Sequence, residues 1–140
     1  MSAVDARAAE SFARQGLMTN YGARMVEAGN GRCVIEADWR ADLTQQHGFF
    51  HAGVTTAICD SAAGYAALTT MAEGADVLSV EFKVNLMAPA DGQLLRAVGE
   101  VVRRGRTLVV VRATAFVVKN GEELPGAECC GTMMTMTPRG

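Results

Sequence analysis

The sequence has no excess of basic residues, and this excludes two classes of partner. Its 13 Lys and Arg residues are balanced by 15 Asp and Glu residues, which leaves a formal net charge of −2. Proteins that bind nucleic acid or an anionic membrane surface gather positive charge on one face, so we expect neither partner. The 140 residues suffice for one domain with its own core, and we expect a single domain over residues 1–140.

Long apolar runs and paired cysteines are also missing. No uncharged segment is long enough to cross a bilayer, and the start, MSAVDARAAESFARQG, mixes acids and bases where a signal peptide has an apolar core. The four cysteines have neither Cys-x-x-Cys nor Cys/His ligand spacing, and adjacent Cys129 and Cys130 would point to opposite faces of a strand. We therefore expect a cytoplasmic protein with reduced thiols and no metal or redox cofactor.

The spacing of the apolar residues predicts helices early in the chain and strands afterwards. A short helix is expected at about 4–15, a hairpin from residues 21–27 and 32–39, and a long helix at about 52–71. Further strands are expected at 77–87, 93–103, 106–119 and 126–137, separated by the turn pairs Asp91-Gly92, Arg104-Gly105 and Asn120-Gly121.

Two of these strands carry more specific expectations. Strict alternation over 77–87 places Ser79 with the charged residues, on the face opposite the apolar ones. The segment 106–119 is apolar on both faces over much of its length, so it should be central in the sheet.

Together these elements predict the α+β class, with a curved, mainly antiparallel sheet of five to six strands around the long helix. The helix needs cover on nearly all sides because it is so apolar. It is also rich in small residues that would let another backbone approach, so we expect a symmetric dimer with these helices near the interface. The alternative is that its alanines merely reflect helix propensity.

Asp60 is the most informative residue of that helix. It is the one side chain certain to be charged between Phe49 and Ala72, and an unpaired buried carboxylate is costly unless it has partners or a shifted pKa. The first turn of the helix, at Ala52 and Gly53, offers free backbone N–H groups and the positive end of the helix dipole. A carboxylate and oxyanion donors are what thioester hydrolysis needs.

Within one helix these two groups cannot meet on one carbonyl. Ala52 and Asp60 are eight residues apart, which is roughly 12 Å along the axis at ~1.5 Å per residue. Two antiparallel helices across a dimer axis would bring the turn of one chain beside the acid of the other. We therefore expect two sites per dimer and none in a monomer.

The segment QQHGFFHAGVTTAICDSAAGYAA resembles the motif of the hotdog-fold acyl-CoA thioesterases of the PaaI-like, phenylacetate-pathway group. In that family an Asn or Gln is followed six residues later by His-Gly-Gly, and nine residues after the His by Asp or Glu. Gln45, His51-Ala52-Gly53 and Asp60 keep this spacing. The resemblance extends into LSVEFKVNLMAPA and GEVVRRGRTLVVVRATAFV, and covers roughly residues 20–137.

The resemblance implies a role for each matching residue. Asp60 would be the nucleophile or general base, the N–H of Ala52 the oxyanion donor, and Gln45 a hydrogen-bond partner of the thioester or of the attacking water. His51 would order the turn, and Ser79 matches a Ser or Thr near the carboxylate that positions water. Ala52 departs from the family's first Gly; its amide survives, and its Cβ would narrow the substrate channel.

Each residue also has a structural alternative. Asp60 would be an ordinary helix acid if it paired with an arginine, and His51 a capping residue without a part in the chemistry. Ser79 would be a surface serine of its strand. Three arginines around one turn, Arg103, Arg104 and Arg106, suit the phosphates of CoA, but such clusters also occur as solvated turns.

The sequence thus predicts a hotdog-fold acyl-CoA thioesterase, a dimer or dimer of dimers, in which CoA enters only as part of the substrate. Two alternatives stay open: a hotdog hydratase or dehydratase acting on acyl thioesters, and a non-catalytic acyl-CoA binding module. The aromatic content of 6% and the small-residue helix do not select an acyl group.

Overall fold

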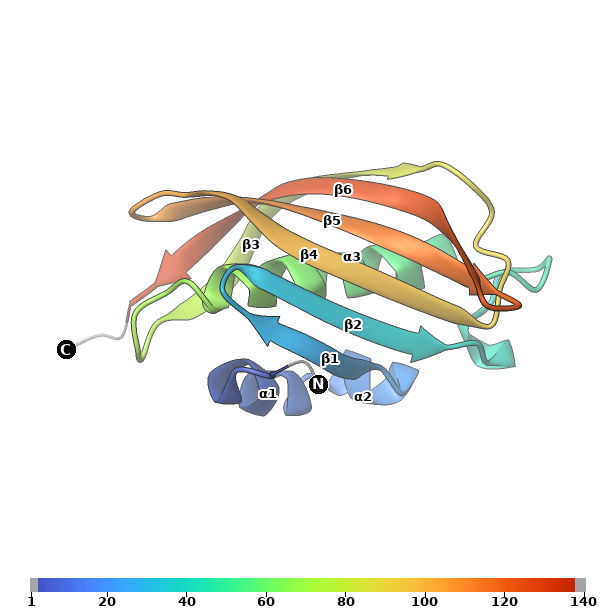
Figure 1. Ribbon diagram of the computed structural model, residues 1–140, viewed down its shortest axis with the longest axis horizontal. Helices are drawn as coiled ribbons and strands as arrows, with labels where there is room; N and C mark the ends of the chain where they lie inside the picture. Colours follow the sequence, from blue (N-terminus) through green and yellow to red (C-terminus); the bar gives the residue numbers. More distant parts are fainter. Residues whose placement is uncertain (1–2, 138–140) are drawn as a thin grey trace.

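A six-stranded antiparallel sheet curves around one long helix (Figure 1). The structure is a computed structural model and describes residues 3–137. The strands follow the spatial order β1-β2-β4-β5-β6-β3. Their bounds are β1 Arg24–Gly29, β2 Arg32–Asp38, β3 Asp76–Leu86, β4 Leu94–Arg104, β5 Leu108–Lys119 and β6 Glu122–Met136. The expected α+β hotdog fold is confirmed, and so is the central place of β5, between β4 and β6.

The N-terminal segment differs from the single helix expected at 4–15. It forms two helices, α1 (Ala6–Ala13) and α2 (Gly16–Tyr21), and the chain turns between them. Asp5 starts α1 because its carboxylate accepts the N–H groups of Arg7, at 2.8 Å, and Ala8, at 3.3 Å. The first strand accordingly begins at Arg24, three residues later than expected.

The long helix, α3 (Ala52–Leu68), ends three residues before its predicted end. The guanidinium of Arg7 lies at this end and donates to the carbonyls of Leu68, Met71 and Ala72 at 3.1 to 3.2 Å. Helix ends leave carbonyls without partners, so Arg7 satisfies groups that α3 cannot. Through this contact α1 holds the last turn of α3.

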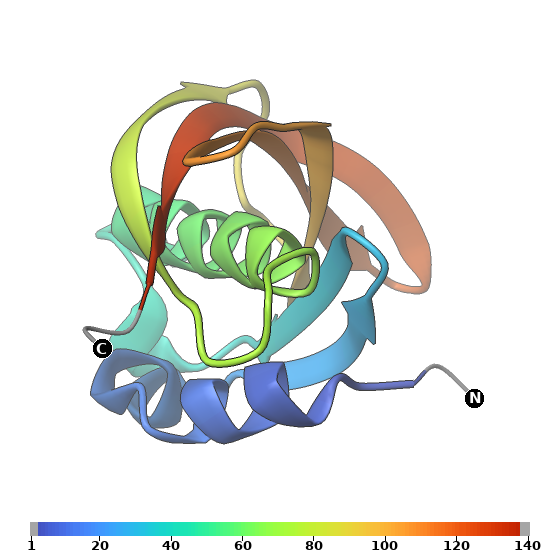
Figure 2. The same ribbon diagram turned by 90° about the vertical axis from the view of Figure 1, so that its left-hand side faces the viewer.

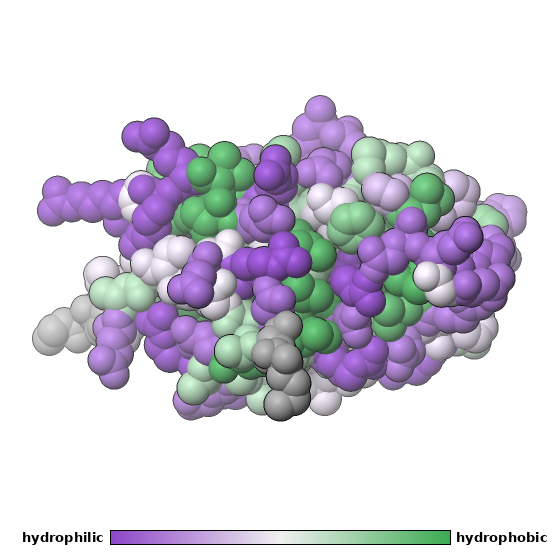
Figure 3. Space-filling view, in the orientation of Figure 1, coloured by the Kyte–Doolittle hydropathy of each residue, from purple (hydrophilic) through white to green (hydrophobic). Residues whose placement is uncertain are grey.

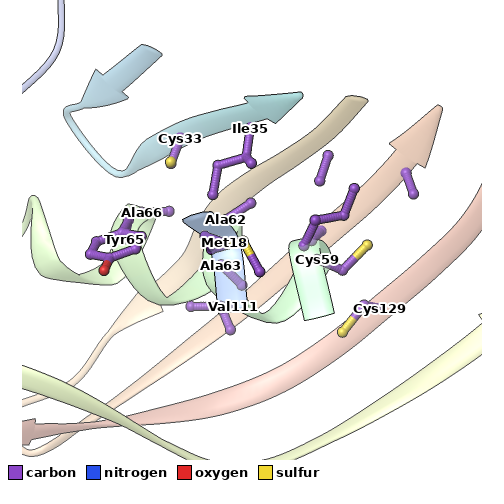
Figure 4. Close-up of a cluster of buried hydrophobic side chains, with 14 of the residues drawn as sticks. Met18, Cys33, Ile35, Cys59, Ala62, Ala63, Tyr65, Ala66, Val111 and Cys129 are labelled. Carbon is purple, nitrogen blue, oxygen red and sulfur yellow. The ribbon is translucent and has the colours of Figure 1, made fainter. Parts of the chain in front are cut away.

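Cover for α3 comes from two sides (Figure 2). The sheet wraps one side, while α1 and α2 close the other, where the rings of Phe12 and Tyr65 meet edge to face at 6.0 Å. Cys59, Ala62, Ala63 and Ala66 of α3 lie among the buried core residues (Figure 4). Small side chains here allow the helix to sit close to the strands.

The two Asn-Gly pairs form tight hairpins. Asn30 and Gly31 join β1 to β2, and Asn120 and Gly121 join β5 to β6. All four have positive φ, between 52° and 83°. Two successive residues with positive φ make the turn that fits the twist of antiparallel strands. The second hairpin starts β6 at Glu122, four residues before its predicted start.

Strand β3 does not alternate as predicted. Its pairing with β6 shifts register between Ser79 and Glu81, so Val80 is an extra residue in a β-bulge. Ser79 is paired with the buried Met133, and its hydroxyl lies 3.3 Å from the sulfur of that residue. The bulge therefore turns Ser79 to the inner face of the sheet, and the expectation that it shares a face with Glu81 is wrong.

Charged residues dominate the outer face of β1, β2 and β4. Arg24 pairs with Asp38 at 2.8 Å, Arg32 with Glu27 at 2.7 Å, and the side chains of Glu36 and Arg96 meet at 2.8 Å. The view in Figure 3 shows mostly hydrophilic residues, with hydrophobic ones in patches among them. Among residues 3–137, no helix combines the length and the apolar character that a membrane crossing requires.

Candidate active site

The turn before α3 carries one free donor. His51 is the N-cap of the helix, and its Nδ1 atom accepts the N–H of Gly53 at 2.8 Å. That N–H of Gly53 is therefore engaged, although the sequence suggested it as a second oxyanion donor. The N–H of Ala52 belongs to the first residue of the helix, where no preceding turn supplies a carbonyl, and Ala52 is exposed. His51 thus orders the turn, and Ala52 supplies the donor.

Gln45 shapes the loop that leads into this turn. Its Oε1 atom accepts the N–H groups of His47, at 2.6 Å, and Phe49, at 3.3 Å. The indole N–H of Trp39 donates to the carbonyl of Gly48 at 2.9 Å and ties the loop to the end of β2. No described residue accepts a hydrogen bond from the side-chain NH₂ group of Gln45, so that group remains able to donate.

Gln45 and Ala52 line one cavity of about 440 Å³. The remaining walls are mostly apolar and come from the loop before α3, from the segment after β3 and from the inner face of the sheet, with Phe49, Leu86 and Leu95 among them. An apolar cavity with a few polar groups at one place is typical of a ligand site.

Asp60 lies in a second hollow, of about 250 Å³. It is half-buried, and the hydroxyl of Ser79 donates to its Oδ1 atom at 2.6 Å. In residues 3–137 no Lys, Arg or His forms an ion pair with this carboxylate. The structural alternative of an Asp60–arginine pair is therefore absent from the described part of the chain.

A hydrogen-bonded network from the N-terminal helices forms another wall of this hollow. Gln15 donates to the hydroxyl of Tyr65 at 2.9 Å and accepts the hydroxyl of Ser61 at 3.1 Å, while Ser11 lies 3.0 Å from the Tyr65 oxygen. Sequence reasoning missed Gln15 and Ser11, because they are more than forty residues from Asp60 and no local pattern links them to α3.

One chain does not bring the donor and the acid together. Ala52 and Gln45 line the first cavity, whereas Asp60 and Ser79 line the second. Between them runs the one stripe of α3 that the chain leaves uncovered: Ala52, Gly53, Thr56, Ala57 and Asp60 are exposed or half-buried. From Ser61 to Leu68 every residue of α3 is buried. The uncovered stripe therefore extends from the donor to the acid.

The turn between β4 and β5 lies at the opposite end of α3 from the donor turn (Figure 1), and the three arginines belong to this turn and to the end of β4. Arg104 donates to the carbonyl of Thr70 and to the hydroxyl of Thr135, each at 3.4 Å, and Arg103 and Arg106 are exposed. The structure does not bring this cluster near Ala52 of the same chain.

The four cysteines are free in the structure, and three are buried. Burial raises the pKa of Cys33 to about 12 and the pKa of Cys129 to about 11. Both thiols are therefore protonated at neutral pH, and a protonated thiol is a poor nucleophile. Within residues 3–137 no three His, Cys, Asp or Glu side chains gather closely enough to hold a metal ion.

Comparisons with known proteins identify the family and the fold. The family model described as "Thioesterase superfamily" matches residues 47–123, which include the donor turn, Asp60 and Ser79. The crystal structure of a thioesterase family protein from Silicibacter pomeroyi is similar, with a TM-score of 0.92 and 45% identity over 94% of this chain and 97% of that one.

More distant proteins share the fold or part of the sequence. A 1,4-dihydroxy-2-naphthoyl-CoA hydrolase from Listeria monocytogenes is 24% identical over 68% of this chain and 77% of that protein. The PaaI protein of the E. coli phenylacetic acid degradation operon has a TM-score of 0.80 at 16% identity, over 91% of this chain and 88% of that one, which is a likeness of fold.

Proposed function

The chain belongs to the Thioesterase superfamily, and from this membership and the geometry of the site we propose that it hydrolyses an acyl-CoA thioester to a free acid and CoA. The observation that carries the proposal is the pair of half-sites on α3. One is a free N–H at Ala52, and the other is a carboxylate at Asp60 that accepts a hydrogen bond from Ser79 and has no ion-pair partner in the described residues.

Each half-site has one task in the proposed reaction. The N–H of Ala52, at the positive end of the helix dipole, stabilises the negative charge that develops on the thioester oxygen. Asp60 either attacks the carbonyl carbon, which expels CoA and leaves an anhydride for water to cleave, or removes a proton from an attacking water. In both routes the carbon–sulfur bond breaks and the thiolate of CoA takes up a proton.

The neighbouring side chains orient these groups. Ser79 holds the carboxylate of Asp60 by its 2.6 Å hydrogen bond, and His51 fixes the turn that presents Ala52. Gln45 lines the same cavity as Ala52, and we propose that its free NH₂ group donates to the thioester or to the attacking water.

We infer that the working site needs two copies of the chain. The uncovered stripe of α3 has Ala52 at one end, Asp60 at the other and Thr56 at its centre. If two such stripes pack antiparallel around a two-fold axis at Thr56, the Ala52 of each chain faces the Asp60 of its partner. This arrangement brings the donor and the acid together, which a single chain does not do.

The edge of the sheet supports the same association. β3 pairs with β6 on one side, and no described strand pairs with its other side. Its residues Phe82 and Leu86 share the inner face with Ser79, yet they are 40% and 58% exposed. An edge strand with exposed apolar residues next to an uncovered helix stripe is a surface suited to a second copy. We also propose that two such dimers associate into a dimer of dimers.

The arginines fit this association as a site for the CoA phosphates. In an antiparallel pair, the C-terminal end of α3 in one chain lies beyond the donor turn of the other, and with it the β4–β5 turn that carries Arg103, Arg104 and Arg106. Guanidinium groups match phosphate oxygens in charge and geometry. We propose that the partner's arginine turn binds the nucleotide end of the CoA whose thioester lies at Ala52.

The proposal is tested by replacing the acid. Asp60→Asn removes the charge and basicity of the carboxylate while keeping its size, so we expect turnover of acyl-CoA to fall at least a hundredfold, about 2.7 kcal/mol in the barrier. Release of free thiol from a panel of acyl-CoA thioesters measures it, and circular dichroism checks the fold.

Asp76→Asn is the matched control, because Asp76 lines the same hollow without contacting Ser79. Unchanged hydrolysis by Asp60→Asn would exclude the proposed chemistry. Saturable binding of acyl-CoA by the wild type without any thiol release would instead favour a binding module.

A further inference from the structure

The hydroxyl of Thr55 lacks a hydrogen-bond partner. Thr55 lies in the first turn of α3 and is 3% exposed, and its Oγ1 is the one buried side-chain nitrogen or oxygen in residues 3–137 that forms no hydrogen bond. Thr69 and Thr70, just beyond the other end of the helix, each donate to a carbonyl three residues earlier at 2.7 Å. A buried hydroxyl without a partner costs free energy, so its presence calls for a reason.

The cavity beside Thr55 supplies the context. Thr55 lines the same 440 Å³ cavity as Ala52 and Gln45, whose other walls include Phe50, Leu95 and Val117. Ala52 is the proposed oxyanion donor, so an acyl group attached to the thioester carbonyl can extend along these apolar walls. Thr55 is three residues further along α3, roughly 4.5 Å along the helix axis at ~1.5 Å per residue.

Resting on the proposed function, we propose that this cavity holds the acyl group and that the Thr55 hydroxyl binds an oxygen on it. The substrate class is an acyl-CoA with a hydroxyl or oxo group at carbon 3, because that oxygen lies only a few ångströms from the thioester oxygen at Ala52. In the unliganded chain Oγ1 is closed off from the cavity, so the proposal includes a rotation about χ1 of Thr55 that turns the hydroxyl to this oxygen, to which it then donates. An acyl chain without this oxygen occupies the same apolar cavity and leaves Oγ1 of Thr55 without a hydrogen-bond partner.

The energetic consequence is selectivity. A tenfold ratio corresponds to about 1.4 kcal/mol, which is at the upper end of what one neutral hydrogen bond contributes. The protein therefore prefers a 3-hydroxyacyl-CoA over the saturated acyl-CoA of equal length by about tenfold. The preference depends on one oxygen atom of the protein.

The experiment compares 3-hydroxyoctanoyl-CoA with octanoyl-CoA. In the wild type we expect kcat/KM to be about tenfold higher for the hydroxylated substrate. Thr55→Val keeps the shape of the side chain but has no hydroxyl, and it should bring this ratio close to one. Thr70→Val, which removes a satisfied hydroxyl far from the cavity, is the matched control and should keep the wild-type ratio.

A binding measurement separates this inference from the proposed function. Dissociation constants of the same two ligands are measured by calorimetry on the Asp60→Asn protein, with and without Thr55→Val. If the tenfold preference appears in binding but no thiol is released by the wild type, the inference stands and the hydrolase proposal fails. If the wild type hydrolyses both substrates with a ratio that Thr55→Val leaves unchanged, the inference is overturned.

Thermal unfolding without ligand gives an independent check. A hydroxyl that has no partner in the free protein destabilises it, so Thr55→Val should raise the unfolding midpoint, whereas Thr70→Val should lower it. A lower midpoint for Thr55→Val would mean that its hydroxyl is already satisfied, for instance by a buried water, and would overturn the inference.

Discussion

The hydroxyl of Ser79 acts on the carboxylate of Asp60, and its removal isolates that contribution. Ser79→Ala deletes the donor at 2.6 Å from Oδ1 and changes little else. We expect kcat to fall about tenfold with a small change in KM, because a lost hydrogen bond to a charged group costs about 1.5 kcal/mol or more. Steady-state kinetics with free-thiol detection measure this.

Ser11→Ala is the control for Ser79→Ala. Ser11 lines the same hollow, but its hydroxyl lies against the Tyr65 oxygen at 3.0 Å and does not reach Asp60. Equal losses in the two variants would show that any change in the hollow lowers turnover, and the assigned role of Ser79 would then be wrong.

Residue by residue, the sequence was informative where the chemistry is local. Asp60 and the turn at His51 and Ala52 follow from one segment, since an N-cap and a lone acid are visible in the order of residues. The face of Ser79 was predicted wrongly, because a bulge depends on how β3 pairs with β6. Thr55 was overlooked, because its lack of a partner is a property of the packed core.

At the scale of elements, the contact between α3 and β4 depends on one glycine. A Cβ atom added at Gly99 would collide with the backbone carbonyl group of Ala62 and lie 2.6 Å from the nitrogen of Ala63. Backbone cannot yield as a flexible side chain can. Gly99→Ala should therefore lower the free energy of unfolding by about 3 kcal/mol, at the upper end of overpacking costs. Urea unfolding followed by circular dichroism measures it.

Gly29→Ala separates this contact from a general effect of alanine in strands. Gly29 ends β1, and a Cβ atom there meets nothing within 4 Å. The free energy of unfolding of the Gly29→Ala protein should stay the same as in the wild type or rise slightly, because alanine reduces the conformational freedom of the unfolded chain. Similar stability of the two variants would mean that α3 can move away from β4, and the close packing would then not be obligatory.

Element boundaries were predictable where a backbone preference sets them. Both Asn-Gly hairpins were expected and confirmed, since positive φ at two successive positions favours these residue types. The break between α1 and α2 was missed, and so was the early end of α3. Arg7 donates to the carbonyl of Leu68, the last residue of α3, and to that of Met71 just beyond it, so this end is stabilised by a contact from sixty residues away that no local pattern shows.

At the scale of the molecule, the uncovered surface is concentrated rather than scattered. The half-exposed stripe of α3 and the inner face of β3 belong to the same side of the chain, next to Asp60 and Ser79. The sequence predicted a small-residue helix in need of cover, but not that α1 and α2 would cover only its C-terminal half. The half that remains open holds both proposed catalytic groups.

This arrangement allows the donor and the acid to be removed from different chains. Ala52→Pro deletes the proposed oxyanion donor, because proline has no backbone N–H. Little strain is expected, since proline is favoured at the first position of a helix. His51 also has extended backbone angles, φ −64° and ψ 141°, which are those favoured before a proline. We expect Ala52→Pro alone to lower turnover by a factor of about 10² to 10³, the usual effect of losing one oxyanion donor. Asp60→Asn alone should be at least as inactive.

Mixing the two inactive proteins should restore activity. If equal amounts of the two proteins are unfolded together and refolded, half of the dimers contain one chain of each kind. Each mixed dimer has two sites, and one of them combines an intact Ala52 with an intact Asp60 from the other chain. The mixture should therefore reach roughly a quarter of the wild-type turnover, provided that subunits pair at random and that the site spans a two-fold axis. A mixture no more active than its components, with mixed dimers demonstrated by mass spectrometry, would show that each chain completes its site alone.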